Sequence, residues 1–407
     1  MKMRCNKISG CDFLFEIEVL LLSLTIIFMV FEKSSLVSTC FYATFIVELF
    51  LLLYLSIQKG YTKDSLLLLL VLIVVIALIN VTINAIINGA NLHFDYYKKY
   101  ISFVSTILFF YLASLIKLSK SCIRFTYITI SLVFIVLIFV FFKSPDLAFY
   151  FPANTADTHD YLTFGFPNPN LTALFLVCFL CVFLFAFIIS KSKIQKLLYG
   201  VLTLFSFFFL IKTRARNALV AVIVLLFFLL FYCIEKRKKH DNDAKRFRFI
   251  NIVAQLFPVV FVIVYISLLQ ITDLHRALSF FESEGKELDS RYYEWLNSIK
   301  LWVKHFLVGD YYGISAGTGD SQALNTAIDL NVSYGTVCYI LVMFFQIRVF
   351  SRIAKESSDY CKYALICAFG ILLCGIGEAA LYAGGTGLSV FAAVLPFVAN
   401  SIKKDLQ

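Results

Sequence analysis

Three cationic side chains stand close together in a short polar turn of an otherwise apolar chain. Lys212, Arg214 and Arg216 belong to the turn KTRARN, which separates the apolar runs LLYGVLTLFSFFFLI and ALVAVIVLLFFLLFYCI. A guanidinium group can donate two parallel hydrogen bonds to phosphate oxygens, so two arginines at positions i and i+2 favour binding of a fixed anion. The alternative is that these side chains only reach water from two helix ends.

The composition places this turn in a membrane protein. The 407 residues are 60% hydrophobic and 15% charged, whereas a soluble domain is about 45–50% apolar and about 25% charged. A helix that crosses the hydrocarbon needs about 20 mainly apolar residues. The sequence therefore predicts an all-α polytopic membrane protein, with residues 1–407 in a single integral membrane domain. The first run follows MKMRCNK without a small-residue cleavage site, which favours an uncleaved first span. The predicted spans, about twelve, are 13–31, 37–57, 65–87, 101–118, 123–142, 171–190, 197–211, 218–234, 249–269, 327–347, 364–382 and 387–400.

The distribution of Lys and Arg predicts the orientation, because cytoplasmic loops are enriched in both. With the N-terminus inside, about two thirds of the 36 basic residues fall on the inner side. The formal net charge of +10 is then mostly a topology signal, and we expect no nucleic-acid partner. The segment 235–248 contains Asp241, Asn242 and Asp243, but it is too short for a sugar-nucleotide domain and is interpreted as an anchor near anionic lipid. The KTRARN turn falls on the outer side, against the rule, which favours the anion interpretation.

The two long loops are also predicted on the outer side, at 143–170 and at roughly 270–326. Long loops on a membrane scaffold often carry binding and chemistry. Neither loop contains Cys, so disulfides do not hold them. Cys178 and Cys181 fall inside an apolar run and are interpreted as small core residues.

The end of the first long loop reads YLTFGFPNPNLTALFL. Gly165, Pro167 and Pro169 break regular structure there, and each proline removes a backbone donor. We expect the next helix to begin near Asn170, which is a suitable N-cap residue. The sequence therefore predicts a rigid, polar segment at the membrane surface.

The second long loop contains an amphipathic pattern in residues 290–313. Trp295, Ile299, Trp302 and Phe306 recur at helical spacing, with polar residues largely on the other faces. Tryptophan favours the membrane interface, so we expect a helix lying flat on the outer surface, with Arg291 at its start. The alternative is a helix packed on the ends of the spans without a chemical role.

Four motifs in this order resemble the O-antigen ligase and Wzy-type polysaccharide polymerase superfamily. They are FGFPNPN, TRAR between two spans, RYYEW…KHFLVG in a large outer loop, and ALNTAIDLNVSYGTVCYIL at the start of the next span. The resemblance covers roughly residues 150–345. The FGFPNPN segment resembles polymerases more than ligases. The resemblance implies a bacterial inner-membrane enzyme with both termini cytoplasmic. Such an enzyme transfers a polyprenyl-diphosphate-linked glycan to the next lipid-linked repeat unit at the outer face, without a metal or nucleotide cofactor. A flippase and a chain-length regulator are the implied partners besides the bilayer.

The resemblance also suggests residue roles. By match to the family's arginine positions, Arg214, Arg216 and Arg291 are the expected contacts to the diphosphate, where fixed cations stabilise the leaving group. The pair Lys98 and Lys99 would support them more weakly. The expected substrate-binding residues are Lys212, Asn168, Asn170, Trp295 and Asn325.

The catalytic base is the part of the pattern in which this chain departs from the family. Members of the family commonly have His-Asn ahead of the span near 327, and this chain has Leu324 and Asn325. Asp320 is the nearest titratable side chain in that segment and is the first candidate, with His159 second. His305 is interpreted as structural. A reaction without a single base is the third possibility, because aligned reactants with a good leaving group need little further help.

A membrane transporter or flippase for the lipid-linked glycan is the alternative from another class. It would suit about twelve spans, but the chain shows no internal repeat, and its charges gather outside the spans instead of at the midplane where transport sites lie. Polar residues inside spans keep the alternative open, because they are costly there and often functional; they would otherwise pair within the bundle. These residues are Glu48, Asn80, Asn84, Asp329 and Glu378.

Overall fold

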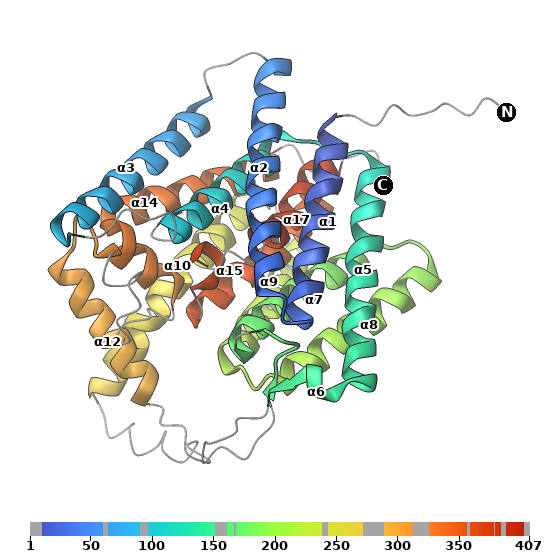
Figure 1. Cartoon of the computed structure of the whole chain (residues 1–407). Helices are drawn as coiled ribbons and strands as arrows, with labels where there is room; N and C mark the ends of the chain where they lie inside the picture. The colour runs from blue at the N-terminus through green and yellow to red at the C-terminus, as the bar shows by residue number, and fades with distance from the viewer. Residues whose placement is uncertain are drawn as a thin grey trace.

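The chain forms a helical bundle (Figure 1). A computed structural model describes residues 10–59, 64–89, 97–150, 161–166, 168–237, 243–271, 289–311, 325–355, 359–377, 379–383 and 388–402. In these ranges the only strands, β1 (Phe149–Tyr150) and β2 (Tyr161–Leu162), pair antiparallel. The helices are α1 (Gly10–Val30), α2 (Ser34–Lys59), α3 (Ser65–Ile87), α4 (Lys98–Leu115), α5 (Lys120–Lys143), α6 (Pro145–Ala148), α7 (Pro169–Ile189), α8 (Lys193–Lys212), α9 (Arg216–Arg237), α10 (Asp243–Ile271), α12 (Asp289–Lys304), α14 (Thr326–Lys355), α15 (Asp359–Leu373), the 3-10 turn η2 (Cys374–Ile376), α16 (Ala380–Ala383) and α17 (Leu388–Ser401).

The prediction of an all-α polytopic membrane protein is confirmed. Within the described ranges, nine helices are long and apolar enough to cross a membrane, and α15 and α17 are shorter apolar helices. Eleven of the apolar runs predicted from the sequence each fall on one helix, whereas the run predicted at 364–382 is divided between α15, η2 and α16. The count of about twelve spans stays a prediction, because α15 and α17 are shorter than the length that a full span requires.

The helices form a buried centre and a lipid-facing periphery. About 78% of the apolar stretch of α7 is buried, against 22% for α8. The centre is filled by aromatic rings, with Phe179 on α7 lying 4.9 Å from Phe134 and 4.8 Å from Phe391, measured between ring centroids. Cys178 and Cys181 are buried in α7, as expected for core residues. The apolar side chains that α8 and the other outer helices expose suit hydrocarbon, where they need no further partner.

Segments predicted on the inner side meet at one end of the bundle. Asp12 at the start of α1 accepts a hydrogen bond from the Ser119 amide at 3.0 Å, and the Leu118 amide donates to Ser401 Oγ at 2.8 Å. The predicted outer segments meet at the other end, as described below. The grouping agrees with the predicted alternation of loops, while the side that faces the cytoplasm stays a prediction.

An ion pair joins two of the segments predicted on the inner side. Arg352 on α14 lies 2.8 Å from Oδ2 of Asp64, which caps α3 by accepting from the Leu66 amide at 3.0 Å. Burial raises the pKa of the Asp64 carboxyl, but the bonds from Arg352 and Leu66, the Arg352 charge and the Tyr111 hydroxyl lower it more. The net result is a pKa below its ordinary value. The folded protein therefore stabilises the ionised form of the Asp64 side chain over its protonated form.

We expect Asp64→Asn to lower stability at neutral pH and to lose this effect in acid. A carboxyl whose pKa is depressed by folding stabilises the protein above its unfolded pKa of about 3.9, and that contribution disappears as the pH falls through the folded pKa. Thermal unfolding of both proteins between neutral pH and about pH 3 measures the difference. Asp146→Asn, at an exposed carboxylate of α6, should show no such trend. If the difference in stability between the wild type and Asp64→Asn stayed constant over the whole pH range, the depressed pKa of Asp64 would be contradicted.

At the end predicted to face outward, α14 is broken and packs on α3 and on the segment that follows α12. Gly335 has φ +80, a conformation that side chains disfavour, and a Cβ there would lie 2.0 Å from the Leu307 carbonyl oxygen. Asn80 donates to the Tyr334 carbonyl at 2.5 Å and Asn84 to the Gly309 carbonyl at 3.2 Å. These two amides of α3 therefore satisfy backbone carbonyls at non-helical positions, which is a structural use of polar groups inside a span.

The amphipathic pattern predicted a helix that the structure has as α12, and Trp295 on that helix is buried against protein. Trp295 is 2% exposed and packs with Val262 and Ile266 of α10 and with Ile328 of α14. Trp302 donates its indole N–H to Thr336 Oγ1 at 2.7 Å. Trp295 thus packs on α10 and α14, whereas Phe306 at the other end of the pattern is 49% exposed; that α12 lies flat on the outer surface stays a prediction. The alternative from the sequence, packing on the spans, describes the packing of Trp295.

Candidate functional site

The KTRARN turn exposes its cations by alternating them with buried residues. Lys212 ends α8, Arg216 begins α9, and both are exposed, as is Arg214. Thr213 and Ala215 between them are 1% and 5% exposed. Thr213 Oγ1 donates to the Leu210 carbonyl at 2.7 Å and accepts from the Ala215 amide at 3.3 Å. The buried residues thus anchor the turn, and the three cations between them are exposed at the same end of the bundle.

Two of these cations rest against aromatic rings. The Arg214 guanidinium carbon lies 5.8 Å from the Tyr161 ring centroid, and Lys212 Nζ lies 5.7 Å from that of Phe208. Both distances lie within the range of about 6 Å for cation–π attraction. Tyr161 belongs to β2 in the first long loop. The structure therefore brings together two motifs that the sequence only predicted on the same side of the membrane.

The described part of the first loop packs tightly beside the turn. The Phe164 ring lies 5.4 Å from that of Phe209 on α8, and Thr172 of α7 donates its hydroxyl to the Thr163 carbonyl at 2.8 Å. Gly165 has φ +73, and a Cβ there would lie 2.4 Å from the Met29 carbonyl oxygen. The segment 161–166 is thus held between α1, α7 and α8, with its apolar side chains buried.

The start of α7 differs by two residues from the expectation. Asn168 is the N-cap, accepting from the Leu171 amide at 2.7 Å, and Pro169 takes the first helical position. Asn170 lies in the first turn instead of capping it. Proline suits that first position because its missing N–H would have no helical partner there. Asn170 then borders a small cleft with Ala215, Asn217 and Gly377.

The electrostatics of the turn favour an anion. Arg216 occupies the first turn of α9, where the unpaired amides and the helix dipole already carry positive charge. A cation at this position disfavours the helix by about 0.3–1 kcal/mol, whereas an anion bound there would be stabilised by the dipole and the arginines together. The positive charge at this turn therefore slightly destabilises α9 when no ligand is bound and favours the binding of a phosphate.

The structure does not describe the side chains of the other expected catalytic residues. His159 and Asp320 fall outside the described residues, so the candidates for the base stay predictions. Arg291 lies in the first turn of α12, and its side chain is outside the described part. Within the described part of the chain, no three His, Cys, Asp or Glu side chains are grouped as a metal site.

Asn325 is placed at a junction instead of a surface. It is fully buried, and its Oδ1 accepts from the amides of Ala327 and Ile328 at 2.9 and 3.1 Å. Its Nδ2 donates to the Pro258 carbonyl at 3.1 Å and to the Ile376 carbonyl at 3.0 Å. These four bonds use the whole capacity of the amide. Asn325 therefore ties the start of α14 to α10 and η2, and in this conformation neither it nor the buried Trp295 presents a group to a substrate.

Lys99 is also committed to the fold. Its Nζ lies 2.7 Å from Asp329 Oδ1 and 2.8 Å from Ser333 Oγ, on α14. This pairing argues against a role of Lys99 at the diphosphate, because its charge is matched by a buried carboxylate. The same pair gives Asp329 a partner within the bundle, although that partner is Lys99 and not one of the other polar residues predicted inside spans.

Sequence reasoning missed the supporting residues of the turn. Tyr161 carries no signal in isolation, since its relation to Arg214 depends on how two distant segments pack. Thr213 and Ala215 could have been found, because small residues alternating with cations indicate which side chains turn inward.

Comparison with protein-family models and with curated proteins finds no match. The functional interpretation therefore depends on the motifs and on the geometry of the turn.

Proposed function

We propose that this protein polymerises polyprenyl-diphosphate-linked oligosaccharide repeat units into a surface polysaccharide, as a metal-independent glycosyltransferase at the outer face of the bacterial cytoplasmic membrane. The observation that carries the proposal is the KTRARN turn, which holds three exposed cations beside the first turn of α9. Arg214 and Arg216 contact the diphosphate of the lipid-linked donor. Lys212, at the end of α8, adds positive charge beside them.

The chemistry requires charge stabilisation at the leaving group. Glycosyl transfer breaks the bond between the anomeric carbon and the diphosphate oxygen, so negative charge grows on the diphosphate in the transition state. Arginine forks fixed in position stabilise that charge without reorganising. The hydroxyl of the next repeat unit forms the new bond and loses a proton, for which Asp320 and then His159 are the proposed acceptors. An O-antigen ligase would use the same donor with a different acceptor.

A transporter or flippase is the competing candidate, and one pair of buried residues favours it. Glu18 on α1 and Glu48 on α2 are fully buried near the middle of their helices, and Ser105 donates to Glu48 Oε1 at 2.8 Å. In the described part of the chain, both carboxyl oxygens of Glu18 are without a hydrogen-bond partner. Ionisable groups at this depth are costly and often functional in transport.

We expect purified protein in vesicles to lengthen the glycan when it is supplied with lipid-linked repeat units. Electrophoresis of the released glycan measures the length. A flippase would move the repeat unit across the bilayer without lengthening it, and a ligase would transfer the glycan to a lipid A core. Absence of lengthening with a competent substrate would reject the polymerase proposal.

A further inference from the structure

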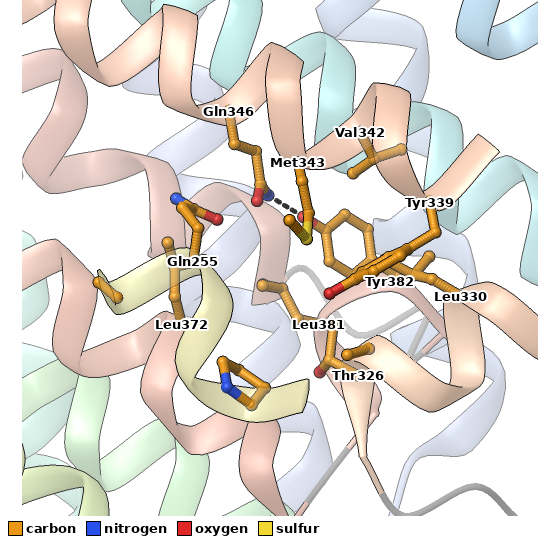
Figure 2. A pocket seen from close by; sticks show the side chains of 13 residues that line it. Gln255, Thr326, Leu330, Tyr339, Val342, Met343, Gln346, Leu372, Leu381 and Tyr382 are labelled. Carbon is orange, nitrogen blue, oxygen red and sulfur yellow. Dashed lines mark hydrogen bonds between the residues drawn. The ribbon is translucent and has the colours of Figure 1, made fainter. Parts of the chain in front are cut away.

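A small cavity lies between α10, α14 and α16, below the junction held by Asn325. Figure 2 shows Gln255 on one side of it and Tyr339, Gln346 and Tyr382 on the other. Its volume of about 30 Å³ is enough for one or two water-sized groups, because one such group needs about 10–15 Å³. A whole sugar ring does not fit, but a single hydroxyl or hydroxymethyl group does.

Two side chains at this cavity carry polar atoms without a partner. Gln255 is 7% exposed and Tyr339 is 8% exposed. In the described structure, neither the Gln255 Nε2 atom nor the Tyr339 hydroxyl has a hydrogen-bond partner. Gln346 and Tyr382, by contrast, bond to each other. Buried polar groups are normally satisfied, so these two point to a ligand that can accept and donate hydrogen bonds.

Pro258, inside α10, leaves a third polar group free. Proline has no N–H, so the carbonyl of Ala254, four residues earlier, lacks its usual helical bond. Ala254 lines the cavity. A hydroxyl could therefore donate to this carbonyl and accept from the Gln255 amide at the same time.

The lining also selects against charged ligands. Of the described residues that line the cavity, none carries a charge. A phosphate or a metal ion would have no counter-charge there, and burying it would be unfavourable. The matching chemistry is that of a neutral hydroxyl group.

The cavity is linked to the cation turn by the short segment η2. Asn325 bonds to the carbonyls of Pro258, at the cavity, and of Ile376, in η2. The next residue, Gly377, approaches Asn217 so closely that a Cβ would lie 2.0 Å from its Nδ2 atom. Asn325 thus connects Pro258 in the cavity wall to η2, and the residue after η2 meets Asn217 beside the cation turn.

We infer that this cavity binds a non-reacting hydroxyl or hydroxymethyl group of the acceptor glycan, and so contributes to recognition of the sugar. This inference rests on the proposed function for the identity of the glycan. Gln255 donates to the hydroxyl, the Ala254 carbonyl accepts from it, and Tyr339 completes its hydrogen bonding. Gln255 and Tyr339 are recognition residues and take no part in the bond that forms.

The test is binding of the lipid-free repeat-unit oligosaccharide, released from the organism's own surface polysaccharide, to the full-length protein in lipid nanodiscs. Calorimetry should give a dissociation constant that rises about 3- to 10-fold in Tyr339→Phe and in Gln255→Leu, the range expected for one lost hydrogen bond. Both variants should unfold no earlier than the wild type, because neither group bonds within the protein. Tyr127→Phe removes another buried, unpartnered hydroxyl, on α5, and should bind as the wild type does.

In the polymer assay the same variants should raise KM for the acceptor while kcat stays within about twofold. Equal binding by the wild type and both variants would mean that the cavity holds water only and would overturn the inference. Absence of oligosaccharide binding by the wild type would overturn it as well. If binding and its dependence on Tyr339 remain while no glycan is lengthened, the polymerase proposal fails and the recognition site stands.

Discussion

Replacing Arg214 or Arg216 by alanine is expected to abolish or sharply reduce polymer formation while the protein remains folded in the membrane. Loss of a charge-assisted contact made in the transition state costs about 2–4 kcal/mol, a factor of about 10²–10³ in rate. Lysine should restore little activity, because a point charge does not reproduce the guanidinium fork. Arg291→Ala should behave in the same way if the resemblance at that position holds.

The fold should tolerate these changes because both guanidinium groups are exposed and the turn is anchored by Thr213 and Ala215. Arg214 has φ +56, which is disfavoured for arginine and alanine alike but not for glycine. Arg214→Gly should therefore be at least as stable as the wild type and still inactive. That combination separates a functional arginine from a structural one.

Initial rates of glycan lengthening, with protein level and thermal unfolding measured in parallel, provide the test. Lys196→Ala is the matched control, since it removes an exposed cation from the opposite end of α8. If the alanine variants of Arg214, Arg216 and Arg291 all formed as much polymer as the wild type, the proposed diphosphate site would be rejected. An inner-side signal from a reporter fused at residue 214 would remove the diphosphate argument altogether.

The second large effect is expected from Lys99→Ala, and it concerns stability. Lys99 is the cation that faces Asp329, which is 3% exposed. In the described structure, the second carboxylate oxygen of Asp329 has no partner. Removing the lysine would leave a buried, uncompensated carboxylate at a cost of about 3–5 kcal/mol. Such a loss is a large part of the stability of most proteins.

Neutralising both partners should restore most of this loss. A Lys99→Met/Asp329→Asn double variant buries no isolated charge, and replacing a buried pair by neutral groups is often close to neutral. Lys98→Ala, at the neighbouring residue on α4, should change stability by less than about 0.5 kcal/mol. Thermal unfolding in detergent and the amount of membrane-inserted protein measure these differences. A single Lys99→Ala variant as stable as the wild type would show that the pair does not hold α4 to α14.

Local patterns in the sequence determined the elements of this protein. Apolar runs long enough to span hydrocarbon predicted the helices, since only a helix satisfies the backbone of such a run in lipid. The helical spacing of Trp295, Ile299 and Trp302 predicted α12. The cluster of cations in KTRARN indicated where an anion could bind, because charge in a short polar turn is visible without knowledge of the fold.

Only the tertiary structure decided which partners these residues meet. The apolar face of α12 could pack on lipid or on protein, and the pattern is the same in both cases; burial of Trp295 against α10 and α14 settled it. Lys99 and Asp329 lie 230 positions apart along the chain, and Asn325 donates to carbonyls of Pro258 in α10 and Ile376 in the 3-10 turn η2. Such contacts depend on how distant helices pack, and periodicity within one helix carries no information about its neighbour.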